Sequence, residues 1–79
     1  MTYNYRLMAH QNESNITFRI HEVYYNEFGV PTLYDQGKLI IDGETINDVN
    51  FTLEDIKKAL EHPILWAGDR FPEHYTGKI

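Results

Sequence analysis

The segment "ITFRIHEVYY", residues 16–25, is the feature that most constrains the fold of this chain. It is rich in β-branched and aromatic residues, which favour a strand over a helix. Residues 3–10, "YNYRLMAH", alternate in a similar way, and the polar stretch between the two segments is turn material. Because strands this close in sequence usually pair, we expect an antiparallel hairpin.

The register of this hairpin follows from the side chains that it gathers on one face. A turn centred on Glu13 and Ser14 pairs residue 9 with residue 18 and residue 7 with residue 20. A slip by one residue would turn the apolar set toward solvent, so burial enforces this pairing. The apolar set, which we call the Leu7 face, is Tyr5, Leu7, Ala9, Phe18, Ile20 and Tyr24. The opposite side, which we call the His21 face, carries Arg6, Met8, His10, Thr17, Arg19, His21, Val23 and Tyr25.

The stretch "NEFG", residues 26–29, predicts a second hairpin turn. Asparagine at its first position and glycine at its last suit a type I turn with a left-handed glycine. Residues 30–36, "VPTLYDQ", then form a third strand. We expect this strand at the sheet edge or bulged, because Pro31 cannot donate a ladder hydrogen bond.

Residues 45–63, "TINDVNFTLEDIKKALEHP", predict one long helix that Pro63 ends. Its apolar residues recur at spacings of three and four, so they form one narrow stripe along the helix. The stripe, which we call the Ile46–Leu60 stripe, consists of Ile46, Val49, Leu53, Ile56 and Leu60. We expect it to pack on the Leu7 face.

Two starts of this helix compete. Thr45 with Asp48 resembles a capping box, whereas Thr52 also fits a capped start with Phe51 as a hydrophobic staple. We favour Thr45, because the stripe is unbroken from there. Phe51 then lies opposite the stripe and is an exposed aromatic.

These elements predict a single α+β domain over residues 1–79, with a three-stranded antiparallel meander followed by one long helix (β-β-β-α). The ordered core covers about residues 3–66, and residues 72–79 form a loose tail. The chain has 79 residues and no cysteine, so no disulfide stabilises it. Stability must come from one small core, extended by oligomerisation.

The charge and the sequence pattern exclude several classes of protein. The net charge of −5 disfavours non-specific binding to nucleic acid, which needs a basic surface. The N-terminus lacks the pattern of a secretory signal, and no apolar stretch approaches the length of a membrane span. We expect a cytoplasmic protein that does not bind a membrane.

Residues for covalent or metal chemistry are not arranged in any motif. The only serine, Ser14, lies in a turn, and there is neither a nucleophile elbow nor a phosphate-binding glycine loop. The four histidines lack metal-ligand spacing. We therefore expect no enzyme, no catalytic residue, no metal and no cofactor. A metal-assisted hydrolase is a remote alternative, because Glu22 is an acid on the Leu7 side of its strand.

Basic and aromatic side chains gather instead on the His21 face of an acidic chain. Tyrosine and arginine are common anchors of protein interfaces, so this face predicts a protein partner, self-association, or both. Single-stranded nucleic acid is the alternative ligand, and a merely solvated face is the simplest interpretation. The candidate binding residues are Arg6, His10, Arg19, His21, Tyr25 and Tyr34.

Three segments carry a resemblance to known proteins: "NYRLMAH", "IHEVYYNEFGVP" and "GETINDVNFTLEDIKKALEHPIL". They resemble a group of short, uncharacterised bacterial and phage proteins with an H-E-V-Y-Y hairpin and a G-E-T helix. The order of elements over residues 3–62 is also similar to HicB-type antitoxin domains, which are shortened relatives of ribonuclease H. That likeness implies a small regulatory module that binds a protein and oligomerises. The chain after Trp66 is too short for the DNA-binding segment of many HicB proteins.

Overall fold

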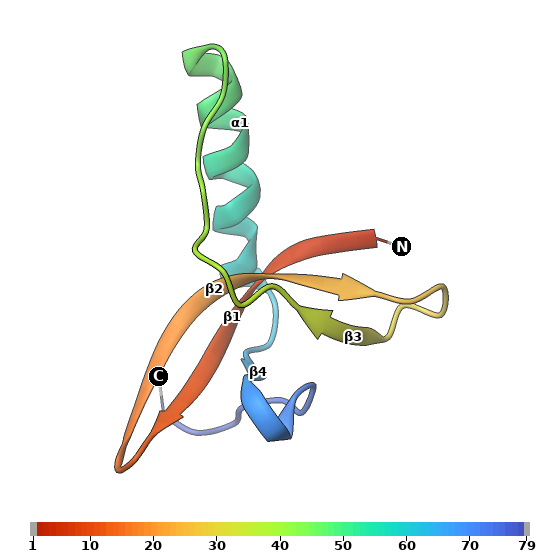
Figure 1. The fold of residues 1–79 in the computed structure, drawn as a ribbon, viewed down its shortest axis with the longest axis vertical. Helices are drawn as coiled ribbons and strands as arrows, with labels where there is room; N and C mark the ends of the chain where they lie inside the picture. Colours follow the sequence, from red (N-terminus) through yellow and green to blue (C-terminus); the bar gives the residue numbers. More distant parts are fainter. Residues whose placement is uncertain (1, 79) are drawn as a thin grey trace.

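The structure, a computed structural model, describes residues 2–78. Met1, the first residue of the predicted domain, and Ile79, the last residue of the predicted loose tail, lie outside the described residues. The chain forms a four-stranded sheet, from which one α-helix rises (Figure 1). In chain order the elements are β1 (Thr2–Asn12), β2 (Asn15–Tyr25), β3 (Pro31–Tyr34), α1 (Ile46–Lys57), the 3-10 helix η1 (Lys58–Glu61), β4 (Leu65–Trp66) and the 3-10 helix η2 (Gly68–Arg70).

The hairpin of β1 and β2 confirms the predicted register. Leu7 lies opposite Ile20, and Ala9 lies opposite Phe18, in an antiparallel ladder that spans both strands. The turn around Glu13 gives this residue a positive φ of 52°, which a tight two-residue connection requires. Every side chain of the pair therefore lies on the predicted face.

The second turn and the third strand also form as the sequence predicts. The side chain of Asn26 accepts hydrogen bonds from the backbone N–H groups of Phe28 and Val30, and Gly29 is left-handed with φ 76°. β3 pairs antiparallel with β2 at one edge of the sheet, and the register shifts at Tyr24 and Tyr25. This irregularity is opposite Pro31, which has no N–H to donate.

The predicted three-stranded meander is wrong, and with it the topology on which the likeness to HicB rested. The sheet has four strands in the order β3-β2-β1-β4, and β4 runs parallel to β1. The pairing joins Met8 to Leu65 and Ala9 to Trp66, so it closes a loop of more than fifty residues. The fold is α+β with a mixed sheet. A strand of two residues has no periodicity to read in the sequence.

The sheet is curled into a half-barrel over its His21 face. β3 and β4 are the two outer strands, yet Gly68, just after β4, donates a backbone hydrogen bond of 2.8 Å to the hydroxyl of Tyr34 in β3. The rings of Tyr34 and Phe71 also meet edge to face, with centroids 4.9 Å apart. Contacts between opposite edges require the sheet to bend, so the His21 face is the concave one.

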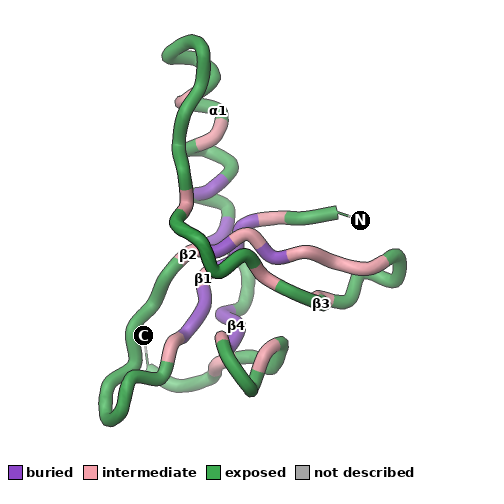
Figure 2. Tube along the Cα trace, in the orientation of Figure 1, coloured by how far each residue is buried: buried purple, intermediate pink, exposed green. Residues whose placement is uncertain are grey.

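Burial follows this curl and not the predicted helix packing. Met8, Val23 and Leu65 are at most 1% exposed and form an apolar cluster on the concave side. On the Leu7 face, Tyr5 and Ala9 are buried, whereas Phe18 remains partly exposed against the ring of Tyr75. Buried segments occur at the middle of β1 and β2, at β4 and at the base of the helix (Figure 2). The predicted solvent-facing side therefore contains much of the core.

The helix begins where the favoured alternative places it. The hydroxyl of Thr45 accepts a hydrogen bond of 3.1 Å from the backbone of Asp48, and Phe51 is exposed. The predicted long helix is shorter than expected, because α1 ends at Lys57 and the 3-10 helix η1 continues the helical segment to Glu61, ahead of Pro63. Within residues 2–78, no helix is both long and apolar enough to cross a membrane.

The expected packing of the Ile46–Leu60 stripe on the sheet is wrong. Ile56 is the one buried residue of the stripe, and it contacts Tyr5 at the helix base. Ile46 is 87% exposed and Leu60 is 65% exposed. The reason is the direction of α1, which points away from the sheet with the connector of residues 35–45 beside it (Figure 1).

Candidate functional site

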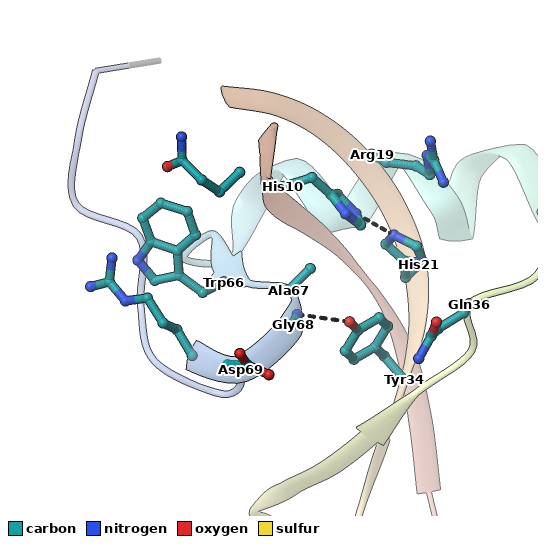
Figure 3. A pocket seen from close by; sticks show the side chains of 11 residues that line it. His10, Arg19, His21, Tyr34, Gln36, Trp66, Ala67, Gly68 and Asp69 are labelled. Carbon is teal, nitrogen blue, oxygen red and sulfur yellow. Dashed lines mark hydrogen bonds between the residues drawn. The ribbon is translucent and has the colours of Figure 1, made fainter. Parts of the chain in front are cut away.

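The concave side of the sheet holds a recess of about 680 Å³ that opens to solvent. β1 and β2 form its floor, and the turn after β4 forms its far wall (Figure 3). Four of the six predicted binding residues line it together: His10, Arg19, His21 and Tyr34. The remaining lining residues are Gln11, Gln36, Trp66, Ala67, Gly68, Asp69 and Arg70. We call this site the recess.

A pair of hydrogen-bonded histidines occupies the floor of the recess. The Nε2 atoms of His10 and His21 are 2.8 Å apart, and Nδ1 of His21 lies 2.8 Å from the backbone oxygen of Asp35. A carbonyl oxygen only accepts, so Nδ1 of His21 must donate. In the neutral ring its Nε2 is then an acceptor, and His10 must donate from Nε2. This chain of bonds fixes the tautomer of both rings.

The same bonds determine where the pair can take up a proton. His21 has both ring nitrogens in hydrogen bonds, whereas Nδ1 of His10 keeps its lone pair. Protonation at that atom leaves the histidine–histidine bond intact. Burial lowers the pKa of His10 from its ordinary 6.5, and the charges of His21 and Arg19 lower it further. The positive charge of Arg19 thus disfavours a proton on His10, and an anion bound in the recess would offset this effect.

The recess concentrates cations on an acidic chain. Of seven lysines and arginines two line it, Arg19 and Arg70, whereas of twelve acidic residues only Asp69 does. The ion pairs formed within residues 2–78 join Lys58 to Asp55 and Arg70 to Glu73, so neither engages Arg19. The guanidinium of Arg19 is exposed and free to bind an anion.

The far wall of the recess was not predicted from the sequence. The guanidinium carbon of Arg70 lies 4.3 Å from the centre of the Trp66 ring, in a cation–π contact. The residues between them form a tight turn, in which Gly68 has a φ of 79°. A glycine and an aspartate between a tryptophan and an arginine are the signal for such a turn, which returns the arginine to the indole.

Arg6 and Tyr25 lie outside the recess and hold the fold together. The guanidinium of Arg6 is buried and donates to the hydroxyl of Tyr25 at 2.8 Å and to the backbone oxygen of Pro63 at 2.7 Å. That hydroxyl in turn donates to the side chain of Asn4 at 2.7 Å. Both side chains are thus engaged within the chain, where they join β1 and β2 to the segment that leads into β4.

Glu22, the acid behind the remote hydrolase alternative, has a local partner. Its carboxylate accepts a hydrogen bond of 2.8 Å from the hydroxyl of Tyr24, and this bond raises the pKa of Tyr24. Across residues 2–78, no group of three or more histidines and carboxylates is placed to hold a metal ion. In this geometry the Glu22 carboxylate is hydrogen-bonded to a neighbour on its own strand.

The comparisons with known proteins give no match for this chain. Neither protein-family models, nor curated proteins, nor solved structures match it. What the recess does must follow from its own geometry and charge.

Proposed function

We propose that this chain is a non-catalytic binding module that holds an acidic segment of a partner protein in the recess. The observation that carries the proposal is the exposed Arg19 guanidinium beside a proton-accepting His10, in a hollow whose lining contains a single acidic residue, Asp69. A carboxylate there would gain charge-assisted hydrogen bonds from a guanidinium and an imidazolium. Gln36, which also lines the recess, adds an amide donor.

The same geometry favours a peptide over single-stranded nucleic acid. Binding of single strands depends on free aromatic faces on which bases stack. In the recess, Trp66 is buried beneath Arg70 and against Tyr75, and the ring of Tyr34 packs against His21 and Phe71. The recess therefore supplies cations and hydrogen-bond donors, but its aromatic faces are already in use.

The hydrogen bonds of the histidine pair support a binding role over a catalytic one. Acid–base catalysis with two histidines needs two ring nitrogens that face the substrate. Here one nitrogen of each ring is bound to the other ring, and the second nitrogen of His21 is bound to the backbone of Asp35. Only Nδ1 of His10 remains for a ligand.

Titration with a short peptide of aspartates and glutamates, followed by NMR, tests the proposal. We expect the signals of His10 and Arg19 to shift, the affinity to fall as salt is added, and Arg19→Gln to weaken binding at least about tenfold. Lys78→Gln is the matched control, because it makes the same change in net charge at a residue outside the recess. Its affinity should equal that of the unmodified chain.

A short single strand of thymidines is titrated in parallel. Tighter binding of this strand than of the acidic peptide, lost in Arg19→Gln, would replace the proposal by a nucleic-acid module. If both probes leave the His10 and Arg19 signals unchanged, the recess is a solvated hollow and the proposal fails.

A further inference from the structure

A second surface lies on the arm, by which we mean the connector of residues 35–45 with α1 and η1. Four of the five most exposed large apolar side chains in residues 2–78 belong to it: Ile40, Ile46, Phe51 and Leu60. The tip of the arm shows no buried residue in Figure 2. A helix of twelve residues is marginal in water unless an apolar face packs against something.

The size of the molecule indicates how much surface awaits a partner. Its accessible surface is 6067 Å², whereas a compact monomer of 9.3 kDa exposes about 5,000 Å². The radius of gyration is 13.4 Å, against about 12 Å for a compact chain of this length. The excess of about 1,100 Å² is comparable with the roughly 800 Å² that each partner buries in a stable complex.

The pattern of the exposed residues points to a helix as the occupant. Spacings of three and four make the Ile46–Leu60 stripe a two-heptad seam, the pattern by which helices pack on helices. Ile46 and Leu60 lie seven residues to either side of Leu53. A twofold axis at Leu53 therefore places Ile46 of one copy against Leu60 of the other, and Leu53 against itself. Ile46, Leu53 and Leu60 are the exposed members of the stripe. We propose that a second copy of this chain covers these three residues, with the helical segments of the two copies antiparallel.

The helix dipoles and the flanking charges fit the antiparallel arrangement. Lys57 flanks the stripe. About the axis at Leu53, Lys57 of one copy lies level with Val49 of the other, one residue from Asp48. The antiparallel pair also opposes the two helix dipoles. Such a self-complementary contact closes as a dimer.

Sedimentation of the full chain over about a hundredfold concentration range tests the proposal. We expect a reversible dimer, and Leu53→Glu should weaken it at least about a hundredfold, because the axis brings two carboxylates together. The matched control is Phe51→Glu, an equal change of charge on the opposite side of the helix, which should leave the dimer intact. Circular dichroism verifies that each variant is folded.

Cysteine cross-linking tests the orientation, since the chain contains no cysteine of its own. Leu53→Cys should form an intermolecular disulfide under mild oxidation, and Phe51→Cys should not. A mixture of Ile46→Cys and Leu60→Cys should cross-link, whereas each alone should do so at least about tenfold less. A monomer at all concentrations, or equal weakening by Phe51→Glu, refutes the dimer. Cross-linking of Ile46→Cys alone as efficient as that of the mixture refutes the antiparallel arrangement.

The dimer and the acidic-peptide function rest on different surfaces, so either can fail without the other. Leu53→Glu should leave the titration of the recess unchanged. Arg19→Gln should leave the dimer unchanged.

Discussion

The free energy of unfolding should depend strongly on Leu65 and hardly at all on Leu60. Both are leucines of the C-terminal half, and the sequence pattern alone would place Leu60 in the core. The structure reverses this, because Leu65 is 1% exposed between Met8 and Val23, whereas Leu60 is among the most exposed apolar residues. Truncating each to alanine removes the same atoms from two opposite environments.

The magnitude follows from burial. Leu65→Ala should cost about 3 kcal/mol, the middle of the range for a buried leucine whose cavity does not collapse. A chain of 79 residues has roughly 4–12 kcal/mol of stability in total, so the melting temperature should fall by roughly 12–24 °C. Leu60→Ala should change the stability by less than about 0.5 kcal/mol.

Urea and thermal unfolding, followed by circular dichroism, measure both values. The two substitutions are best made in the Leu53→Glu background, so that self-association through the stripe does not add to the stability of either. A loss of stability in Leu60→Ala equal to that in Leu65→Ala would refute the curled sheet, since it would mean that the stripe packs on the strands.

Three further predictions concern single side chains. The pKa of His10 is held below 6.5 in the folded state, so the unfolded chain binds more protons as the pH falls through 6.5. The free energy of unfolding should therefore be constant above pH 6.5 and decrease below it. Urea titrations at several pH values should show this decrease, and it should be absent in His10→Gln. Arg6→Met should cost about 2 kcal/mol in urea denaturation, because two charged hydrogen bonds are lost while one buried charge is relieved. Thr45→Ala should lower the stability of α1 by about 1 kcal/mol, which amide exchange in the helix should show as faster exchange. Thr52→Ala should have less effect. The reverse order would favour a helix that starts at Thr52.

Local features of the fold could be predicted from the sequence because neighbours along the chain determine them. The register of the first hairpin, the left-handed Gly29 and the start of α1 at Thr45 each follow from a few adjacent residues. The pairing of Met8 with Leu65 joins distant residues through a strand of only two. A strand this short has no alternating pattern in the sequence, so the sequence did not predict the fourth strand or the curl of the sheet that it completes.

The choice of a single buried face was incomplete for the same physical reason. Counting apolar side chains favours the Leu7 face, which does contain part of the core, but the turn after β4 buries the other face as well. His10, Arg19 and His21 meet in the recess because they lie on the same face of the first hairpin, and Tyr34 joins them from the neighbouring strand β3. Arg6 shares the parity too, yet its long side chain turns to the backbone of Pro63. Sequence parity gives the face of a side chain but not its partners.

The contact between Tyr34 and Gly68 has a consequence for ligand binding. It joins the two outer edges of the sheet, and both residues line the recess. A ligand that contacts both Arg19 and the wall at Gly68 would therefore stabilise the closed form of the sheet by its binding free energy. Amide hydrogen exchange at Gly68 reports on the Tyr34–Gly68 hydrogen bond. The factor by which a ligand slows this exchange measures the coupling between ligand binding and that hydrogen bond.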